Sequence, residues 1–179
     1  MTDLKKIVSP ITLDLVVAFS DLTGFARFSR TKTREDLFDF ISGYYEFTGD
    51  IIEQAGGTVV KYIGDSILIA YPEEIVDDAV LNLISLKDSG DQWLRGKGSK
   101  CKHIIKVHCG AVICGEVGSG ESKRFDIFGD TVNNTALLQS HGYSMTPQLF
   151  RKLNSNTRKY FKKHTPPITY IPIEERHTD

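Results

Sequence analysis

The chain has 179 residues, of which 40% are hydrophobic and 25% are charged, and its formal net charge is −1. This length suits one domain with its own core, and the near-neutral charge gives no general attraction to nucleic acid or to anionic membranes. The apolar runs are far too short to span a bilayer, and Pro10 and Asp14 interrupt the N-terminal segment. We therefore expect neither direct membrane insertion nor a signal peptide.

Three cysteines, at positions 101, 109 and 114, form no Cys-x-x-Cys pair. Cys109 and Cys114 lie an odd number of residues apart on a predicted strand, so their side chains should point to opposite faces of the sheet. An odd count without a close pair is typical of buried free thiols in a reducing compartment. We therefore expect a cytoplasmic protein.

The first two elements that the sequence predicts are a buried strand over 12–19 and a long helix over 33–55. Thr33 and Asp36 resemble a capping box at the start of this helix. Apolar residues then recur at helical spacing. Gly56-Gly57 follows the last of them, as is common where a helix ends in a left-handed residue.

Two short apolar runs come next, at 58–63 and 67–71, and Gly64-Asp65 joins them. Glycine and aspartate between two such runs indicate a β-hairpin. A second helix is predicted from about Glu73, and we expect it to end in the polar, glycine-containing stretch 89–100 because such residues favour loops.

The second half of the chain predicts a long strand over 104–117 and a short strand over 125–128. A helix is expected from Asp130 to Leu138, another from Pro147, and a last strand over 168–173. Neither a repeat nor a low-complexity linker separates these elements, so we predict one α+β domain over 1–179. We expect the ends, 1–11 and 174–179, to be poorly ordered.

Two aspartates stand out because each follows an apolar strand and lies near a glycine. Asp21 precedes Gly24, and Asp65 lies in the turn of the hairpin. Two carboxylates held at strand ends are a plausible site for Mg²⁺ or Mn²⁺, which prefer hard oxygen ligands. Each also has an ordinary structural explanation: Asp21 could cap the helix that follows, and Gly-Asp is common turn chemistry.

The order of four motifs carries more information than any one of them. The motifs are Phe19-x-Asp21-Leu22-Thr23-Gly24-Phe25, Lys61-x-x-Gly64-Asp65, His108-Cys109-Gly110-x-Val112-x-x-Gly115-x-Val117-Gly118 and Phe125-Asp126-Ile127-x-Gly129-Asp130-x-Val132-Asn133. From about Leu15 to Leu138 the chain resembles the catalytic domain of class III nucleotidyl cyclases, the adenylate and guanylate cyclases. The resemblance implies a ferredoxin-like α+β fold whose mostly antiparallel central sheet is flanked by helices.

The resemblance also implies a reaction and a set of partners. In that family two subunits pack head to tail and enclose the active sites at their interface, so a homodimer would hold two equivalent sites. The reaction is attack of the ribose 3′-oxygen of ATP on the α-phosphorus, which yields 3′,5′-cyclic AMP and pyrophosphate. Two divalent metal ions, Mg²⁺ or Mn²⁺, would assist it.

By motif, the resemblance assigns roles to nine residues of this chain. Asp21 and Asp65 would hold the metal ions, and the backbone of four residues would cradle the triphosphate: Leu22, Thr23, Gly24 and Phe25. From the other subunit, Lys61 and Asp126 would read the adenine, and Asn133 would position the ribose.

The pair Lys61 and Asp126 favours ATP over GTP. A lysine can donate to adenine N1, and a carboxylate can accept from the exocyclic N6 amine. Guanine reverses both polarities at these positions, and such a mismatch is heavily penalised where water is excluded.

The chain departs from the family pattern in two places. The family has an arginine four residues after the asparagine, which stabilises the charged transition state, and here that position is Leu137. The family also carries a phosphate-contacting lysine in a longer C-terminal segment than this chain has. We therefore expect weak or conditional adenylate cyclase activity. The alternatives are a catalytically inactive cyclase-fold module that binds a nucleotide or a partner, and one half of a heterodimer with a different cyclase-fold chain.

Overall fold

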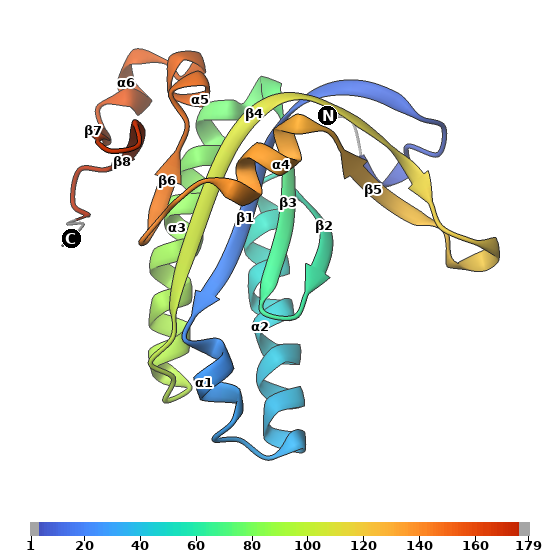
Figure 1. Cartoon of the computed structure of the whole chain (residues 1–179), viewed down its shortest axis with the longest axis vertical. Helices are drawn as coiled ribbons and strands as arrows, with labels where there is room; N and C mark the ends of the chain where they lie inside the picture. Colours follow the sequence, from blue (N-terminus) through green and yellow to red (C-terminus); the bar gives the residue numbers. More distant parts are fainter. Residues whose placement is uncertain (1–3, 176–179) are drawn as a thin grey trace.

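A computed structural model describes residues 4–175 and shows one mixed sheet of eight strands, with helices on both of its faces (Figure 1). Seven strands run in the order β2-β3-β1-β4-β6-β8-β7, and β5 pairs with β4. Their bounds are β1 Ile11–Thr23, β2 Thr58–Ile63, β3 Ser66–Pro72, β4 Lys102–Val117, β5 Arg124–Phe128, β6 Tyr143–Met145, β7 Phe161–His164 and β8 Thr169–Pro172. All of the pairings are antiparallel except that of β4 with β6. The predicted α+β architecture is confirmed.

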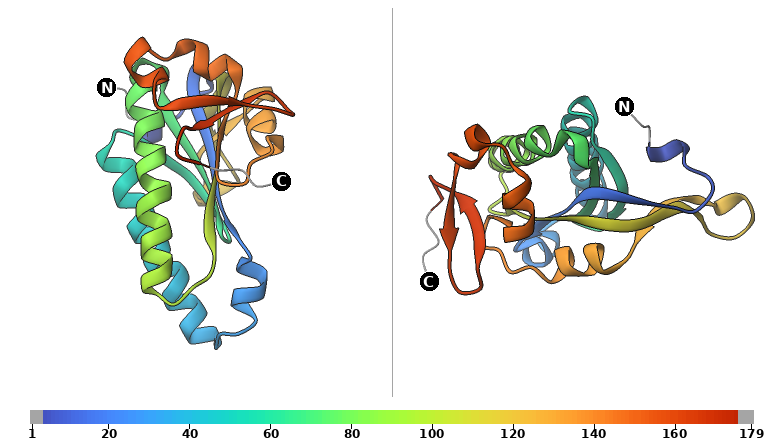
Figure 2. Two further views of the ribbon diagram at one scale, coloured as in Figure 1. Left: turned by 90° about the vertical axis from the view of Figure 1, so that its left-hand side faces the viewer. Right: turned by 90° about the horizontal axis from the view of Figure 1, so that it is seen from above.

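The two longest helices, α2 and α3, cover one face of the sheet, and α4 lies on the other (Figure 2). The helices are α1 Phe25–Ser29, α2 Arg34–Gln54, α3 Val76–Gly96, α4 Asp130–Leu137, α5 Pro147–Lys152 and α6 Ser155–Arg158. Short 3₁₀ turns occupy Leu4–Lys6, Glu73–Ile75 and Gly120–Ser122. No helix within residues 4–175 is both long and apolar enough to cross a membrane.

The two faces of the sheet contribute to two separate hydrophobic clusters, because side chains alternate along each strand. In β1, Val16 and Ala18 face the helices α2 and α3, whereas Leu15 and Val17 face the opposite side. Cys109 and Cys114 belong to different clusters, and all three cysteines are buried and free, as the sequence predicted.

The structure confirms the start and the end of the predicted long helix and the turn of the predicted hairpin. The side chain of Thr33 accepts a hydrogen bond from the backbone N–H of Asp36 at the start of α2. Gly56 has a φ of 78°, which is the left-handed conformation that favours glycine after a helix. Strands β2 and β3 then meet in the turn at Gly64-Asp65.

The prediction that the second helix ends near residue 89 is wrong, because α3 continues to Gly96. Gln92 and Arg95 in this stretch are exposed, while Leu94 is fully buried and Gly90 packs against the ring of His103. Burial of the apolar face outweighs the weak helix propensity of glycine. The sequence also did not predict β6, β7 or α6, all of which are short.

The expectation that 1–11 and 174–179 are poorly ordered stays a prediction. Leu4 is only 2% exposed and packs in the cluster that contains Leu15 and Val17, whereas residues 5–6 and 8–11 are exposed. Residues 1–3 and 176–179, which the same expectation covered, lie outside the described residues.

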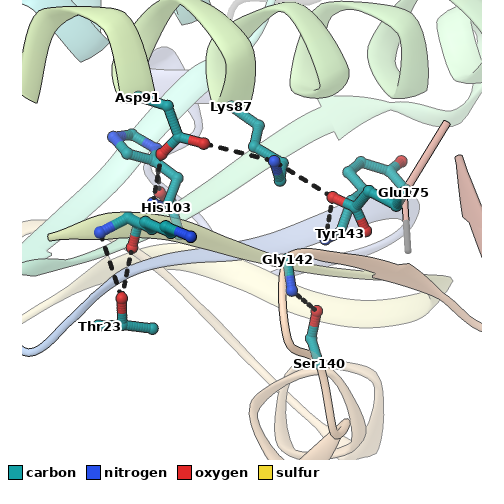
Figure 3. A network of polar contacts seen from close by, with 10 residues as sticks. Thr23, Lys87, Asp91, His103, Ser140, Gly142, Tyr143 and Glu175 are labelled. Carbon is teal, nitrogen blue, oxygen red and sulfur yellow. Dashed lines mark hydrogen bonds and ion pairs between the residues drawn. The ribbon is translucent and has the colours of Figure 1, made fainter. Parts of the chain in front are cut away.

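A polar network fixes the C-terminal segment to α3 and β6 (Figure 3). The ammonium group of Lys87 lies 3.4 Å from Asp91 and 3.2 Å from Glu175. Asp91 accepts a hydrogen bond from the backbone N–H of His103, and Glu175 accepts one from that of Tyr143. Glu175 therefore contacts both α3 and β6.

Candidate active site

Asp21 and Asp65 come together because β1 pairs with β3. The register places Ser20 opposite Ile67, so Asp21 lies opposite Ser66, the residue that follows Asp65 and starts β3. Ser66 donates a hydrogen bond from its hydroxyl to a carboxylate oxygen of Asp21 at 2.5 Å. The turn that carries Asp65 is held from the other side, since the Tyr45 hydroxyl donates to the carbonyl of Gly64.

The electrostatics of this pair fit a cation. Burial raises the pKa of the Asp65 carboxyl, and the negative charge of Asp21 raises it further, against hydrogen bonds from backbone N–H groups. Two carboxylates that repel each other lose that repulsion when a divalent cation lies between them. Within residues 4–175 no cluster of three or more His, Cys, Asp or Glu side chains could hold a metal ion by itself. A metal at Asp21 and Asp65 would therefore take further oxygen ligands from water or substrate.

The predicted phosphate segment, 22–25, links β1 to α1. Leu22 is buried and anchors the end of the strand, and Thr23 and Gly24 are exposed. Gly24 has a φ of 76° and accepts hydrogen bonds from the backbone of the first turn of α1, so the chain reverses sharply there. Thr23 and Gly24 also line a cavity of about 490 Å³ whose wall includes Arg27 and Lys100.

Lys61 and Asp126, the two predicted base-reading residues, form an ion pair within one chain. The Lys61 ammonium lies 2.5 Å from a carboxylate oxygen of Asp126, whose other oxygen accepts from the backbone N–H of Ile127. The Asp126 side chain is 14% exposed and that of Lys61 is 35% exposed. The pair is thus partly buried, and its ammonium group is more exposed than its carboxylate.

A β-bulge in β2 directs Lys61 to this position. Val59 pairs with Ile69, but Lys61 pairs with Leu68, so Val60 is the extra residue. Without the bulge, Lys61 would share a face with Val59, under the helices. With it, Lys61 shares the opposite face with Leu68 and reaches β5.

Asn133 lies on α4 and is exposed, and so is Leu137 one turn later, whose side chain is 80% exposed. Residues four apart lie on the same face of a helix. A leucine in an amphipathic helix commonly packs into a core or an interface. Leu137 takes no part in the core, because it projects from α4 away from the sheet.

The structure therefore arranges the predicted residues in three groups on one chain: Asp21 and Asp65 with the segment 22–25, Lys61 with Asp126, and Asn133 on α4. Sequence reasoning missed Ser66, which orients the carboxylate of Asp21. Its only sequence signal was its position directly after Gly64-Asp65.

Comparison with known families gives one extensive match. The model of the adenylate and guanylate cyclase catalytic domain matches residues 9–163. Two curated relatives are an adenylate cyclase of Anabaena cylindrica, 26% identical over 130 residues, and the receptor-type guanylate cyclase gcy-6 of Caenorhabditis elegans, 29% identical over 147 residues. These alignments cover 68% and 77% of this chain but only 26% and 13% of the relatives, so the chain corresponds to a minor part of each.

Solved structures show the same fold. A bacterial light-regulated adenylyl cyclase superposes with a TM-score of 0.80 and 21% sequence identity, over 95% of this chain and 54% of the other. The adenylyl cyclase CyaB from P. aeruginosa gives a TM-score of 0.79 and 18% identity, over 94% of this chain and 98% of the other. The relatives include both adenylate and guanylate cyclases, so similarity alone does not decide which nucleotide this chain uses.

Proposed function

The chain belongs to the family of adenylate and guanylate cyclase catalytic domains, and on that premise we propose that it converts ATP to 3′,5′-cyclic AMP and pyrophosphate. In this proposal two copies of the chain pack head to tail. Each active site takes Asp21, Asp65 and the segment 22–25 from one copy. It takes Lys61, Asp126 and Asn133 from the other.

The observation that carries the choice of ATP is the contact between Lys61 and Asp126. Because the two side chains touch, a donor and an acceptor are presented side by side at the distance of neighbouring atoms on a base edge. Adenine N1 accepts from the ammonium and the N6 amine donates to the carboxylate. Guanine offers N1–H to the ammonium and O6 to the carboxylate, which leaves both contacts unsatisfied.

The protein groups divide the remaining work between binding and orientation. Asn133 donates to or accepts from the ribose and holds the 3′-hydroxyl near the α-phosphorus. Backbone N–H groups of the segment 22–25 bind phosphate oxygens, for which the sharp reversal at Gly24 is suited. Asp21 and Asp65 hold the divalent ions, which supply Lewis acidity at the 3′-hydroxyl and neutralise charge on the triphosphate.

A dimer is supported by the exposure of the substrate-binding groups. Asn133 is exposed and the Lys61–Asp126 pair is partly exposed on one chain, where a second copy could cover them and exclude water. Apolar side chains near these groups are also exposed. They include Ile63 at the end of β2, Phe128 at the end of β5, and Leu137.

The experiment that tests the function is the formation of cyclic nucleotide by the purified chain at high concentration with Mn²⁺. ATP and GTP are supplied separately, and the products are identified by chromatography and mass spectrometry. We expect cyclic AMP from ATP, much less cyclic GMP, and no product from Asp21→Ala. Undiminished turnover by Asp21→Ala would refute the metal assignment, and preferential turnover of GTP would refute the choice of base.

The exposure of Leu137 in place of the family's arginine favours a second candidate, a nucleotide-binding module without turnover. If the chain is such a module, calorimetry should show metal-dependent ATP binding, and long incubation with ATP should yield no cyclic AMP. A heterodimer with a cyclase-fold partner that supplies the arginine predicts the same silence. Sedimentation together with calorimetry separates the nucleotide-binding module from the heterodimer. A stable homodimer with two occupied ATP sites would contradict the heterodimer.

A further inference from the structure

A lysine on the sheet beneath α4 places a positive charge next to the position where the family has its arginine. Lys106 of β4 donates a hydrogen bond from its ammonium group to the carbonyl oxygen of Ala136, at 2.9 Å. Ala136 directly precedes Leu137 in the last turn of α4. We propose that Lys106 stabilises the transition state in place of the arginine that Leu137 replaces, an inference that rests on the proposed function.

The position of Lys106 under α4 is fixed by contacts at both ends of the helix. In the first turn, the hydroxyl of Thr131 donates to the carbonyl of Ala111, and there is no room for a side chain at Gly110, where an added Cβ would lie 2.8 Å from that hydroxyl. In the last turn, Lys106 reaches Ala136. The helix therefore runs antiparallel to β4, and its exposed face carries Asn133.

Lys106 also shares a face of the sheet with the base-reading pair. Directly paired residues of neighbouring strands point to the same face. The register joins Lys61 to Leu68, Leu68 to Phe19, and Phe19 to Lys106 in one row across four strands. Three strand spacings separate the two lysines at the backbone, roughly 14 Å. The row thus has the base-reading group at one end and, at the other, the ammonium group of Lys106, which is hydrogen-bonded to Ala136 under α4.

Stabilising the transition state requires a positive charge and a hydrogen-bond donor near the α-phosphorus. As the bond from the 3′-oxygen to the α-phosphorus forms, the bond from phosphorus to the pyrophosphate oxygen breaks, and the 3′-hydroxyl proton leaves to water. Negative charge grows on the oxygens around phosphorus, and Lys106 stabilises it by moving its hydrogen bond from Ala136 to a phosphate oxygen. An ammonium group makes one such contact as a point charge, without the two parallel bonds of a guanidinium.

A purely structural role would explain the same contact. A lysine at the C-terminal end of a helix satisfies an orphan carbonyl and interacts well with the helix dipole. The test must therefore measure kcat and KM as well as stability, because loss of a helix cap lowers stability without a selective effect on kcat. Lys159, which follows α6 and contacts Asn156, provides a matched helix-end lysine far along the chain.

The test is a double-mutant cycle on Lys106 and Leu137, with kcat, KM and thermal stability measured for each variant. We expect Lys106→Met to lower kcat by about 10²–10³-fold, the usual effect of losing one donor to a charged transition state, with KM for ATP changed less than about threefold. Lys106→Arg should keep most of the activity. Leu137→Arg should add little in the native chain but restore kcat in Lys106→Met, a strong non-additivity. Lys159→Met should change none of these kinetic constants.

The outcomes separate this inference from the function on which it rests. Native turnover that Lys106→Met leaves intact, or that Leu137→Arg fails to restore, overturns the role of Lys106 and leaves the cyclase proposal standing. If the native chain shows no turnover until Leu137 is replaced by arginine, the role of Lys106 is also overturned, because Lys106 then does not stabilise the transition state. Silence of every variant refutes the cyclase proposal itself.

A mixed dimer tests to which active site Lys106 belongs. If Lys106 acts with Asn133 of its own chain, a dimer of one Asp21→Ala chain and one Lys106→Met chain has one intact site. Such a dimer should regain about half of the native activity, as should the control dimer of Asp21→Ala with Asn133→Ala. If only the control dimer is active, Lys106 acts with its own Asp21, and the assignment to the α4 side is wrong.

Discussion

Lys61 and Asp126 are 65 residues apart in the sequence, yet the ammonium nitrogen of one lies 2.5 Å from a carboxylate oxygen of the other. The bulge at Val60 turns Lys61 to the face of the sheet that β5 approaches. Lys61 also lies 5.8 Å from the ring centroid of Phe128, the last residue of β5. The pair is thus held by two strands rather than by one flexible loop.

Reversing the polarity of this pair should reverse the preference for the base. The double substitution Lys61→Glu with Asp126→Lys keeps an ion pair but presents an acceptor to N1 and a donor to position 6, which suits guanine. We expect the ratio of kcat/KM for GTP to that for ATP to rise by about 100-fold or more, because sites built around hydrogen bonds discriminate strongly. Parallel assays with both nucleotides measure it. An unchanged ratio would mean that the pair does not read the base.

Removing either acidic side chain of the metal pair should stop catalysis without unfolding the protein. We expect Asp65→Asn to lower turnover by roughly 10³-fold or more, since a metal ion contributes several kcal/mol to the transition state. In metal-free buffer the same variant should melt at a higher temperature than the native chain, because it removes the repulsion between Asp65 and Asp21. Turnover assays measure the first effect, and thermal melting with and without Mn²⁺ measures the second.

The control for this prediction is Asp39→Asn, which removes an exposed carboxylate from α2. It should leave both turnover and the response to Mn²⁺ as they are in the native chain. If Asp65→Asn melts below the native chain in metal-free buffer, the two carboxylates do not repel each other in the folded protein.

The contact between α3 and β4 predicts a sensitive position at Gly90. A Cβ added there would lie 2.5 Å from the ring of His103, which is fully packed and has little room to move. We expect Gly90→Ala to lower the free energy of unfolding by about 1–3 kcal/mol through overpacking. Gly96→Ala, at the open end of the same helix, meets nothing within 4 Å and should be neutral or slightly stabilising. Urea unfolding compares them, and equal stability of the two variants would contradict the packing.

His103 should make the folded state sensitive to acid. Burial lowers the pKa of His103 from 6.5 to about 4, with Asp91 acting in the opposite direction and Lys87 reinforcing the decrease. The unfolded chain therefore binds a proton at a higher pH than the folded chain does. Above pH 6.5 His103 is neutral in both states and does not lower the free energy of unfolding. As the pH falls toward 4, the unfolded chain gains a proton that the folded chain does not, and the free energy of unfolding decreases progressively.

The measurement is urea unfolding between pH 7 and pH 5. The shift in the pKa of His103 corresponds to a loss of about 2 kcal/mol over this range, at 1.36 kcal/mol per pKa unit. His103→Gln removes the titrating group, so its free energy of unfolding should fall less steeply by that amount. Parallel slopes for the native chain and the variant would show that His103 does not titrate as its burial requires.

The elements that the sequence predicted best are those with strong local signals. Thr33 marks the start of α2, Gly56 marks its end, and Gly64-Asp65 marks the turn of the hairpin, because each residue type suits a local backbone conformation. The end of α3 was mispredicted for the converse reason. Gly90 weakens a helix locally, but its contact with His103 on β4 is a tertiary feature that no local pattern contains.

By itself the sequence determined the family and the strand, turn or helix on which each candidate site residue lies, because these depend on residue type and short-range order. Only the tertiary structure decided which side chains meet. The bulge at Val60 brings Lys61 to Asp126, the pairing of β1 with β3 brings Ser66 to Asp21, and the path of α4 over β4 brings Lys106 to Ala136. The physical reason is the register of the strands, which is set by the packing of side chains from distant parts of the sequence in the core. A shift of one residue would turn each of these side chains to the other face of the sheet.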